Sequence, residues 1–523
     1  MRVLLITFLF LITSIGFAQV PDYMEHNNTR VTLPTLGKFF NDDLNALPGF
    51  EVPKNSGNHT MYEARFYFMG LDANDTLHAA WGGGGTGVGN DFMSGPYSTF
   101  NNYDTVYQNT WMDRTVQICQ EEIDMYSLWW EACNSPNPPI PCVQAPVPSN
   151  DLLTRIYDWP AHGNTANGEA YELAPYFDHP ASTQGVYDPG NGDYPIIKGC
   201  CATYRIDHDD RVHTFSGGKK LGIETHYQTF QYRNWGLLNN VTFIEITVYN
   251  RGNTVYPEFA YGMYLDSQLG DFSDDYIGSD SIRSMYFTYN ADNNDVQYGV
   301  DPPAFGVVAL EDSLTSVVSF ANFNTLAEVW NGMNGLMPNG MPIMDNQGNI
   351  SSFEYNVNPN VTGGWSEVEV QNAPSDRRAI IATKHGVFAP GDSFKQTYAF
   401  VYANDGDHLQ SVDSLYAAAD EIHAFYDTIT NAQCEGGVLS ALSLSEPLGV
   451  QLFPNPASGY VHVTLDTPGE MEATMRDMSG KVIVAENGSG TITFDLTGVA
   501  NGAYFVQIQS GGDIATKKLI VDR

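Results

Sequence analysis

The amino-acid sequence predicts a mainly β protein, with a β-sandwich-rich region that holds a few helices and a small Ig-like β-sandwich at the C-terminus. Three observations lead to this fold class. Gly (49) and Pro (28) are frequent, and 39 of the 61 acidic residues are Asp, which favours caps and turns over helix interiors. Short runs of alternating apolar and polar residues recur between these turn formers. Hydrophobic residues make up 42% of the chain and aromatic residues 13%, which is enough for packed cores.

The net charge limits the partners of the chain. Asp and Glu total 61, Lys and Arg total 24, and the formal charge is −37. Nucleic-acid binding and docking on an anionic membrane both need a basic face. We therefore expect neither kind of partner. A chain of 523 residues also exceeds what one hydrophobic core supports, so two or more domains are expected.

Residues 1–18 have the features of a signal peptide. Arg2 supplies a positive charge, residues 3–15 are an almost continuous apolar run, and small residues at positions 16 and 18 place a cleavage site before Gln19. The apolar run is shorter than the roughly 20 residues that a membrane-spanning helix needs. We expect export to the periplasm and no integral membrane span.

The six cysteines all lie in the region that we expect to be exported: Cys119, Cys133, Cys142, Cys200, Cys201 and Cys434. An even count outside the cytosol favours disulfides. Cys119, Cys133 and Cys142 flank a Pro-rich stretch, where a local disulfide is expected. Cys200 and Cys201 are adjacent, and because a ring between neighbours is strained, each is expected to pair elsewhere. A zinc site is the alternative, although no two-residue Cys spacing recurs.

Residues 19–432 form the β-rich cargo region, for which a division into two subdomains near residue 300 is one option. A first helix is expected from about residue 120 to 131. Residues 243–249 alternate in the manner of a half-buried strand, and residues 397–402 form another strand. A second helix is predicted from an N-cap at Ser411, because six apolar or aromatic residues follow at helical spacing: Val412, Leu415, Tyr416, Ala419, Ile422 and Tyr426.

After a linker at residues 433–443, residues 444–523 contain short alternating runs between Gly, Asn and Pro, which is typical of a small antiparallel sandwich. Five sequence blocks follow one another there: Leu452-Phe453-Pro454-Asn455-Pro456-Ala457-Ser458, Asp477-Met478-Ser479-Gly480-Lys481-Val482, Asp495-Leu496-Thr497-Gly498-Val499, Asn501-Gly502-Ala503-Tyr504-Phe505-Val506 and Lys517-Lys518-Leu519-Ile520-Val521. Their order resembles the C-terminal sorting domain (type A) of the type IX secretion system of Bacteroidetes. The resemblance implies that this secretion machinery is a partner of the chain. It also implies that the protein is secreted or lies at the outer cell surface.

The cargo region also contains distinctive blocks, among them Phe50-Glu51-Val52-Pro53-Lys54, Trp159-Pro160-Ala161-His162-Gly163, Asp274-Asp275-Tyr276-Ile277-Gly278-Ser279-Asp280 and Asp376-Arg377-Arg378. Together they resemble a large group of Bacteroidetes surface or secreted proteins that carry the same sorting domain and have no established activity. The resemblance runs through most of the cargo region. It implies an exported context and names no reaction.

Two Asp-rich loops are the best candidates for cation binding. The first has five carboxylates within 15 residues, with Ser and Gly between them: Asp266, Asp271, Asp274, Asp275 and Asp280. Calcium takes roughly six to eight oxygen ligands on a flexible loop, whereas softer metals favour His or Cys. The alternative is a solvated acidic turn whose side chains cap backbone amides, which is also the simpler interpretation of a third run at residues 292–295.

The second loop contains Asp178, Asp188 and Asp193. The resembling proteins have a tighter D-x-N-x-D-G spacing there, and His179-Pro180 departs from it. Calcium is the cofactor that both loops predict.

His213, Glu224 and His226 form a different kind of candidate site. Glu224 and His226 are two residues apart on a predicted strand and so share a face, and His213 precedes them across a Gly-containing turn. Two His and a carboxylate can hold zinc or iron with open coordination positions. The alternative is polar packing across strands, since the chain has no H-E-x-x-H helix.

Motif searches leave two classes of function. The chain has no G-x-S-x-G nucleophile elbow, no Walker phosphate loop and no G-x-G-x-x-G opening a helix. We expect a calcium-stabilised, non-catalytic adhesion or glycan-contact protein whose partners are glycans or surface polysaccharide. The alternative is a secreted hydrolase of polysaccharide or protein, whose Asp, Glu and His come together only in the fold.

Overall fold

The chain folds into two compact units. In the computed structural model, residues 1–434 form the first unit, here called the cargo unit, and residues 435–523 form the sorting unit. The residues described are 23–42, 47–83, 89–233, 236–319, 325–428, 450–455, 457–465, 469–476, 482–510 and 513–521. The predicted signal peptide and linker lie outside the described residues.

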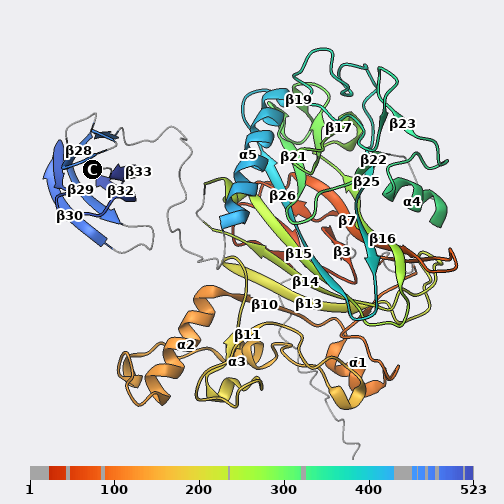
Figure 1. Cartoon of the computed structure of the whole chain (residues 1–523), viewed down its shortest axis with the longest axis horizontal. Coiled ribbons are helices and arrows are strands. Elements are labelled where there is room, and N and C mark those ends of the chain that lie inside the picture. The colour runs from red at the N-terminus through yellow and green to blue at the C-terminus, as the bar shows by residue number, and fades with distance from the viewer. Residues whose placement is uncertain are drawn as a thin grey trace, which may run out of the picture. The chain divides into compact units, whose positions relative to one another are not determined.

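A nine-stranded antiparallel sheet forms one layer of the cargo unit (Figure 1). Its strand order is β1-β2-β6-β7-β16-β25-β22, and β3 and β8 also pair with β7. The strands are β1 (Tyr23–Met24), β2 (Arg30–Thr32), β3 (Lys38–Phe39), β6 (Phe50–Glu51), β7 (His59–Leu71), β8 (Leu77–Trp81), β16 (Tyr256–Ser267), β22 (Ser316–Ser319) and β25 (Arg378–Phe388).

A second nine-stranded antiparallel sheet forms the other layer. Its order is β10-β13-β14-β15-β26-β21-β18-β17, and β9 also pairs with β13. The strands are β9 (Met93–Ser94), β10 (Thr115–Cys119), β13 (Cys201–His208), β14 (Ile223–Gln231), β15 (Val241–Asn250), β17 (Asp275–Asp280), β18 (Met285–Asn290), β21 (Ala304–Ala309) and β26 (Ser393–Ala403). Because β21 pairs with both β18 and β26, this sheet continues across residue 300 and the cargo unit does not divide there.

Four short two-stranded sheets accompany these layers among the described residues. They are β4 (Asn41–Asp42) with β5 (Leu47–Pro48), β11 (Tyr176–Phe177) with β12 (Tyr194–Pro195), β19 (Asn294–Asp295) with β20 (Gly299–Val300), and β23 (Ile343–Met344) with β24 (Ile350–Ser351).

The two sheets share one core, which confirms the predicted sandwich. Side chains of β7, β16 and β25 meet those of β14, β15 and β26 in a single buried cluster. Along β15, Ile244, Ile246 and Val248 are fully buried in this cluster. Because successive side chains of a strand point to opposite faces, Glu245 and Thr247 lie on the outer face of the second sheet.

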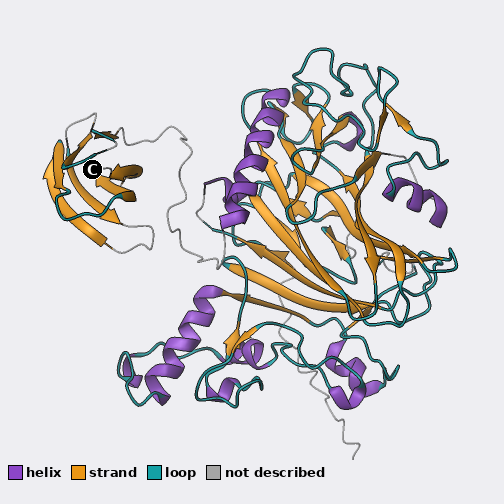
Figure 2. Ribbon diagram, in the orientation of Figure 1, coloured by secondary structure: helices purple, strands orange, loops and turns teal. Residues whose placement is uncertain are grey.

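The helices cover the outer faces of the sheets (Figure 2). They are α1 (Thr105–Trp111), α2 (Gln120–Asn134), α3 (Asn150–Tyr157), α4 (Leu326–Met333) and α5 (His408–Thr428). The predicted second helix is α5, and its apolar stripe packs on β18, β21 and β26. The helix begins earlier than expected: the Asp407 carboxylate accepts from the N–H groups of Leu409 and Gln410, at 3.0 and 2.9 Å, so Asp407 and not Ser411 caps it.

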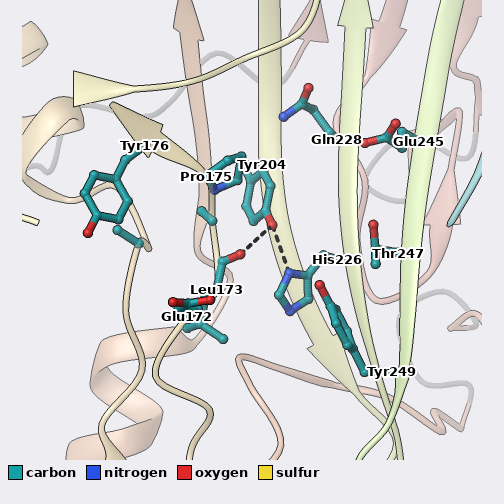
Figure 3. A pocket seen from close by; sticks show the side chains of 12 residues that line it. Glu172, Leu173, Pro175, Tyr176, Tyr204, His226, Gln228, Glu245, Thr247 and Tyr249 are labelled. Atoms are coloured by element: carbon teal, nitrogen blue, oxygen red, sulfur yellow. Dashed lines mark hydrogen bonds between the residues drawn. The ribbon is translucent and has the colours of Figure 1, made fainter. Parts of the chain in front are cut away.

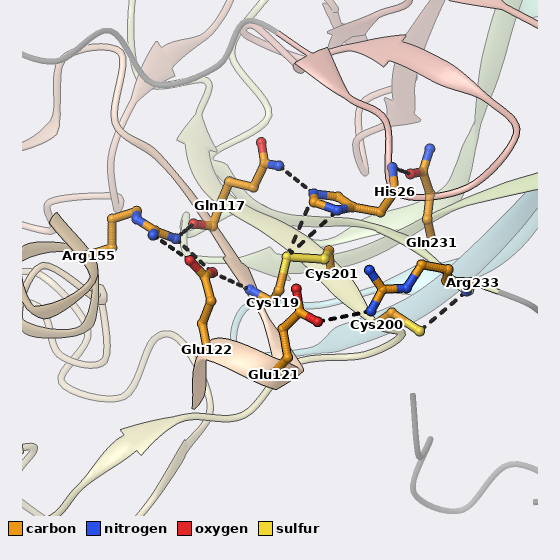
Figure 4. The surroundings of a disulfide bond; sticks show 10 residues. All are labelled: His26, Gln117, Cys119, Glu121, Glu122, Arg155, Cys200, Cys201, Gln231 and Arg233. Carbon is orange, nitrogen blue, oxygen red and sulfur yellow. Dashed lines mark hydrogen bonds and ion pairs between the residues drawn. A yellow bond between two sulfur atoms is a disulfide. The ribbon is translucent and has the colours of Figure 1, made fainter. Parts of the chain in front are cut away.

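Two disulfides fasten the segment that carries α2. Cys119 and Cys201 are directly opposed on β10 and β13 and are bonded to each other (Figure 4). Cys133 and Cys142 form the local bridge expected beside the Pro-rich stretch. Cys200 is also disulfide-bonded, so the adjacent cysteines do not pair with each other.

The sorting unit is a small two-sheet sandwich, as predicted. One sheet pairs β27 (Val450–Phe453), β28 (Tyr460–Leu465) and β31 (Thr491–Asp495), and the other has the order β30-β29-β32-β33. The strands of the second are β29 (Glu470–Arg476), β30 (Val482–Ser489), β32 (Gly502–Ser510) and β33 (Asp513–Val521). Both sheets contribute to one apolar cluster.

The core between the large sheets predicts a difference between two apolar truncations. Ile246→Ala leaves a cavity in the shared core and should lower the free energy of unfolding by about 2–4 kcal/mol. Val387→Ala, on an exposed position of β25, should change it by less than about 0.5 kcal/mol. Urea unfolding followed by Trp fluorescence reports on the cargo unit alone, because all eight Trp residues precede residue 434. Equal effects of the two changes would contradict the shared core.

Candidate functional site

A cavity of about 420 Å³ lies on the outer face of the second sheet, next to residues 172–176 (Figure 3). Its floor comes from three neighbouring strands, with Tyr204 on β13, His226 and Gln228 on β14, and Glu245, Thr247 and Tyr249 on β15. The other lining residues are Ala161, Glu172, Leu173, Ala174, Pro175 and Tyr176.

The strand registers bring these floor residues together. Tyr204 is directly opposite Gln228, and Gln228 is directly opposite Glu245 on the next strand. His226 is likewise opposite Thr247. Residues in register on adjacent antiparallel strands have their Cβ atoms about 5 Å apart on one face. The pairing therefore places a phenol, a carboxamide and a carboxylate in one row across the cavity.

A chain of hydrogen bonds fixes the floor at His226. The Nε2 atom of His226 lies 3.0 Å from Oε1 of Glu224, and its Nδ1 atom lies 2.9 Å from the Tyr204 hydroxyl. Glu224 is fully buried and also accepts from Arg251 at 2.7 Å and from the N–H of Tyr97 at 2.7 Å. Since an ionised carboxylate only accepts, Glu224 holds a proton of His226 on Nε2. The Tyr204 hydroxyl also donates to the Leu173 carbonyl at 3.4 Å.

The charge states of this chain follow from its partners. Burial alone would raise the pKa of Glu224, but the hydrogen bond and charge of His226, together with the charge of Arg251, lower it to about 2. Burial raises the pKa of Tyr204 well above its usual value, and the neighbouring Tyr249, Glu224 and Glu245 add to this effect. Tyr204 is therefore a neutral hydrogen-bond donor, and the floor is rigid and polar.

The lining of the cavity carries two carboxylates, Glu245 on the floor and Glu172 on the bordering segment. Glu245 is half-buried and pairs with Lys198 and, at 3.4 Å, with Lys395. Glu172 is exposed on the segment that borders the cavity. The Oε1 atom of Gln228 accepts from the N–H of Lys198 at 2.9 Å, which fixes the orientation of the carboxamide. Such a set of donors and acceptors, beside the rings of Tyr176 and Tyr249, suits a polyhydroxylated ligand.

The three residues predicted as a transition-metal site do not converge. Glu224 and His226 are hydrogen-bonded, but both ring nitrogens of His213 contact backbone carbonyls, Nδ1 that of Ala79 at 2.6 Å and Nε2 that of Asp209 at 2.9 Å. Within the described residues, the single set of three His, Cys or acidic groups with ligand atoms within 4.8 Å of one another is His26, Cys119 and Cys201. Both sulfurs of that set are in a disulfide (Figure 4), so they offer no thiolate.

The second Asp-rich loop organises its own backbone. The buried carboxylate of Asp193 accepts from the N–H groups of His179 and Asp188 and from the Ser182 hydroxyl, at 2.7 to 2.9 Å. Asp178 accepts from Gln184 and from the N–H of Gly185, and Asp188 accepts from Asn191.

The first Asp-rich loop separates into two groups. Asp266 pairs with Arg378 at 3.2 Å, and Asp280 pairs with Arg283 at 2.8 Å. Asp271, Asp274 and Asp275 make no ion pair among the described residues and lie near Asp295 from the third acidic run.

Sequence reasoning found His226 but missed most of the cavity. Tyr204, Gln228, Glu245 and Tyr249 come from three strands that are adjacent only in the sheet. One local signal existed: residues 243–249 alternate between aliphatic side chains and polar or aromatic ones, which marks a strand with a non-aliphatic outer face.

Together the two units define a β-sandwich protein that carries a separate small C-terminal sandwich. Residues 451–522 match the family described as "Secretion system C-terminal sorting domain". This match confirms the sorting domain predicted from the sequence blocks, and it implies a secretion system as partner, export, and a location at the surface or outside the cell. No helix of the described residues is long and apolar enough to cross a membrane.

Comparison with other proteins adds little about the cargo unit. No curated protein matches the sequence. Among solved structures, a polysaccharide lyase matches 57% of this chain at 9% identity with a TM-score of 0.20, and a β-glucuronidase from Ruminococcus gnavus matches 51% at 8% identity with a TM-score of 0.13. The chain spans only 34% and 37% of these two proteins. Likeness at this level supports no conclusion about activity.

The low pKa of Glu224 predicts a pH-dependent contribution to stability. A carboxylate whose pKa is lowered on folding stabilises the folded state above its ordinary pKa, and this contribution is lost as the pH falls toward about 2. Glu224→Gln should therefore lower the free energy of unfolding by about 3 kcal/mol at pH 7, and the difference from the parent should shrink between pH 5 and pH 3. Urea unfolding across this pH range measures it. The exposed Glu258→Gln is the control, and a pH-independent difference for Glu224→Gln would refute the assignment.

Proposed function

We propose that the cargo unit is a non-catalytic glycan-contact module, displayed outside the cell or at its surface, that binds a neutral carbohydrate in the cavity above β13, β14 and β15. The main support for this proposal is the row of Tyr204, Gln228 and Glu245 in register across three strands, beside the half-buried ring of Tyr249. Kinship of the cargo unit with the uncharacterised Bacteroidetes surface proteins, and delivery by type IX secretion, are part of this proposal.

The chemistry of the lining supports a sugar ligand. Carboxylates and carboxamides bind pairs of sugar hydroxyls, while aromatic rings pack against the apolar faces of sugar rings. Tyr249 is held in place because Arg251 lies over its ring, 4.2 Å from the centroid, and His226 packs against it at 4.9 Å. The ring therefore offers a preformed surface, which reduces the entropy lost on binding.

Charge favours a neutral sugar over an acidic one. Lys198 and Lys395 both pair with Glu245, and Glu172 adds a second carboxylate to the lining, so these four charges cancel. The whole chain has a formal charge of −37. A uronate or sulfated sugar would therefore be repelled by the protein as a whole.

Binding can be tested by calorimetry with neutral oligosaccharides of mannan, xylan and β-glucan, and with oligogalacturonate as the acidic comparison. We expect at least one neutral oligosaccharide to bind. Tyr249→Ala should weaken it about tenfold, because the ring contact is lost, and Tyr249→Phe should bind within about twofold of the parent.

Tyr157→Ala is the matched control, since Tyr157 is an exposed tyrosine outside the cavity. Tighter binding of oligogalacturonate, or equal weakening by Tyr157→Ala and Tyr249→Ala, would refute the proposal.

Hydrolysis is the second candidate function, because Glu172 and Glu245 line one cavity and paired carboxyl groups cleave glycosides. Under the binding proposal, the parent protein should release no reducing ends from the same oligosaccharides. Release that is lost in both Glu172→Gln and Glu245→Gln, and kept in Glu258→Gln, would replace the binding proposal with hydrolysis.

A further inference from the structure

The connection from the first sheet to the second carries Asp271 and Asp274, which form no ion pair with Lys, Arg or His among the described residues. The chain leaves β16 at Ser267 and enters β17 at Asp275, passing Asp271 and Asp274. The β19–β20 hairpin lies against this connection, because the N–H of Asp271 donates to Oδ2 of Asp295 at 2.8 Å. Each pair among the four carboxylates repels, and in the described ranges none of them pairs with Lys, Arg or His.

Asp275 is the most deeply buried member of this group. Its side chain is 0% exposed. Oδ2 accepts from the N–H of Leu269 at 3.2 Å, while the buried Oδ1 has no hydrogen-bond partner among the described residues. The buried Oδ1 of Asp274 also makes no hydrogen bond there, although the Asn290 side chain lies close enough to the carboxylate to lower its pKa. Leaving a buried carboxylate oxygen unpaired is strongly unfavourable, so a bound cation would stabilise this arrangement.

The remaining two residues of the predicted loop, Asp266 and Asp280, each pair with an arginine. Asp266 is mostly buried and pairs with Arg378, although burial still raises its pKa to about 6; Asp280 pairs with Arg283. No such guanidinium acts on Asp275: burial raises its pKa well above the usual range, and the charges that raise it further are those of Asp274, Asp295 and Asp271. Burial likewise raises the pKa of Asp274 to about 6.

Asp295 is fixed as a wall of the group. Its Oδ1 accepts from the N–H groups of Gln297 and Tyr298, at 2.7 and 2.5 Å. Gly270 has φ +67°, and a Cβ built there would lie 2.2 Å from Oδ1 of Asp295. Only glycine allows the carboxylate to approach the crossing connection this closely.

We propose that Asp271, Asp274, Asp275 and Asp295 bind one Ca²⁺ that fastens the connection between the two sheets. All four offer hard oxygen ligands, and no His or Cys is among them, so a softer metal is disfavoured. No three of the carboxylates have oxygens within 4.8 Å of one another. Asp275 and Asp295 are fixed, so closure requires rotation of the half-buried Asp271 and Asp274 toward them, and calcium tolerates such flexible geometry better than magnesium.

This inference is independent of the proposed sugar site, since it shares no residue with the cavity. Thermal unfolding of the full chain tests it by Trp fluorescence in 1 mM CaCl₂, in 1 mM MgCl₂ and in EDTA. Calcium should raise the Tm by about 5 °C over EDTA, and magnesium by less.

Asp275→Asn should change the Tm relative to the parent in opposite directions in EDTA and in calcium. It keeps the shape of the side chain and removes the buried charge, so in EDTA its Tm should equal or exceed that of the parent, while in calcium it should fall below the parent. Asp280→Asn is the matched control on the same loop and should keep the full calcium response. Asp274→Asn, at a half-buried position, serves if Asp275→Asn does not fold, and it should lose most of the calcium response.

An unchanged Tm of the parent in EDTA and calcium would overturn the proposal. A calcium response that survives in both Asp274→Asn and Asp275→Asn would overturn it too, because the ion would then bind elsewhere. Equal loss of the response in Asp280→Asn would refute the ligand set.

Discussion

The packing of the two large sheets on each other determines which side chains of their strands face the core and which face outward. Ile244, Ile246 and Val248 fill the space between the sheets, so the intervening side chains of β15 must lie on the opposite face. A one-residue slip of that strand would exchange the two sets and bury Glu245 in an aliphatic core. The register that protects the core is therefore also the register that assembles the cavity floor.

Buried charge is handled in two different ways in this molecule. Glu224 lies beneath the cavity with Arg251, His226 and the N–H of Tyr97 around it, and its pKa falls in spite of burial. Asp275 is buried to the same extent with a single N–H donor, and its pKa rises. The difference comes from the partners and not from the degree of burial. It separates a carboxylate that completes a protein network from one for which we propose a bound cation.

Local sequence patterns predicted helices and strands better than they predicted the residues of the candidate sites. The alternation of residues 243–249 gave a strand, and the stripe of α5 gave a helix, because both depend on neighbours in the sequence. The start of α5 was misplaced because Ser411 and Asp407 are both good caps, and only the backbone path shows which carboxylate or hydroxyl meets the free N–H groups. Asp266 and Asp280 were grouped with their neighbours because their Arg partners could not be inferred from spacing alone.

By itself, the sequence determined the mainly β fold class and the sorting domain, since composition, alternation and ordered blocks are properties of contiguous residues. It also predicted an Asp-rich loop as a cation site. The tertiary structure decided that Asp295 joins that loop while Asp266 and Asp280 leave it, and that Tyr204, Gln228 and Glu245 share one cavity. These relations depend on strand pairing between residues 17 and 24 positions apart, and on hydrogen bonds across the sheet, which no local pattern encodes.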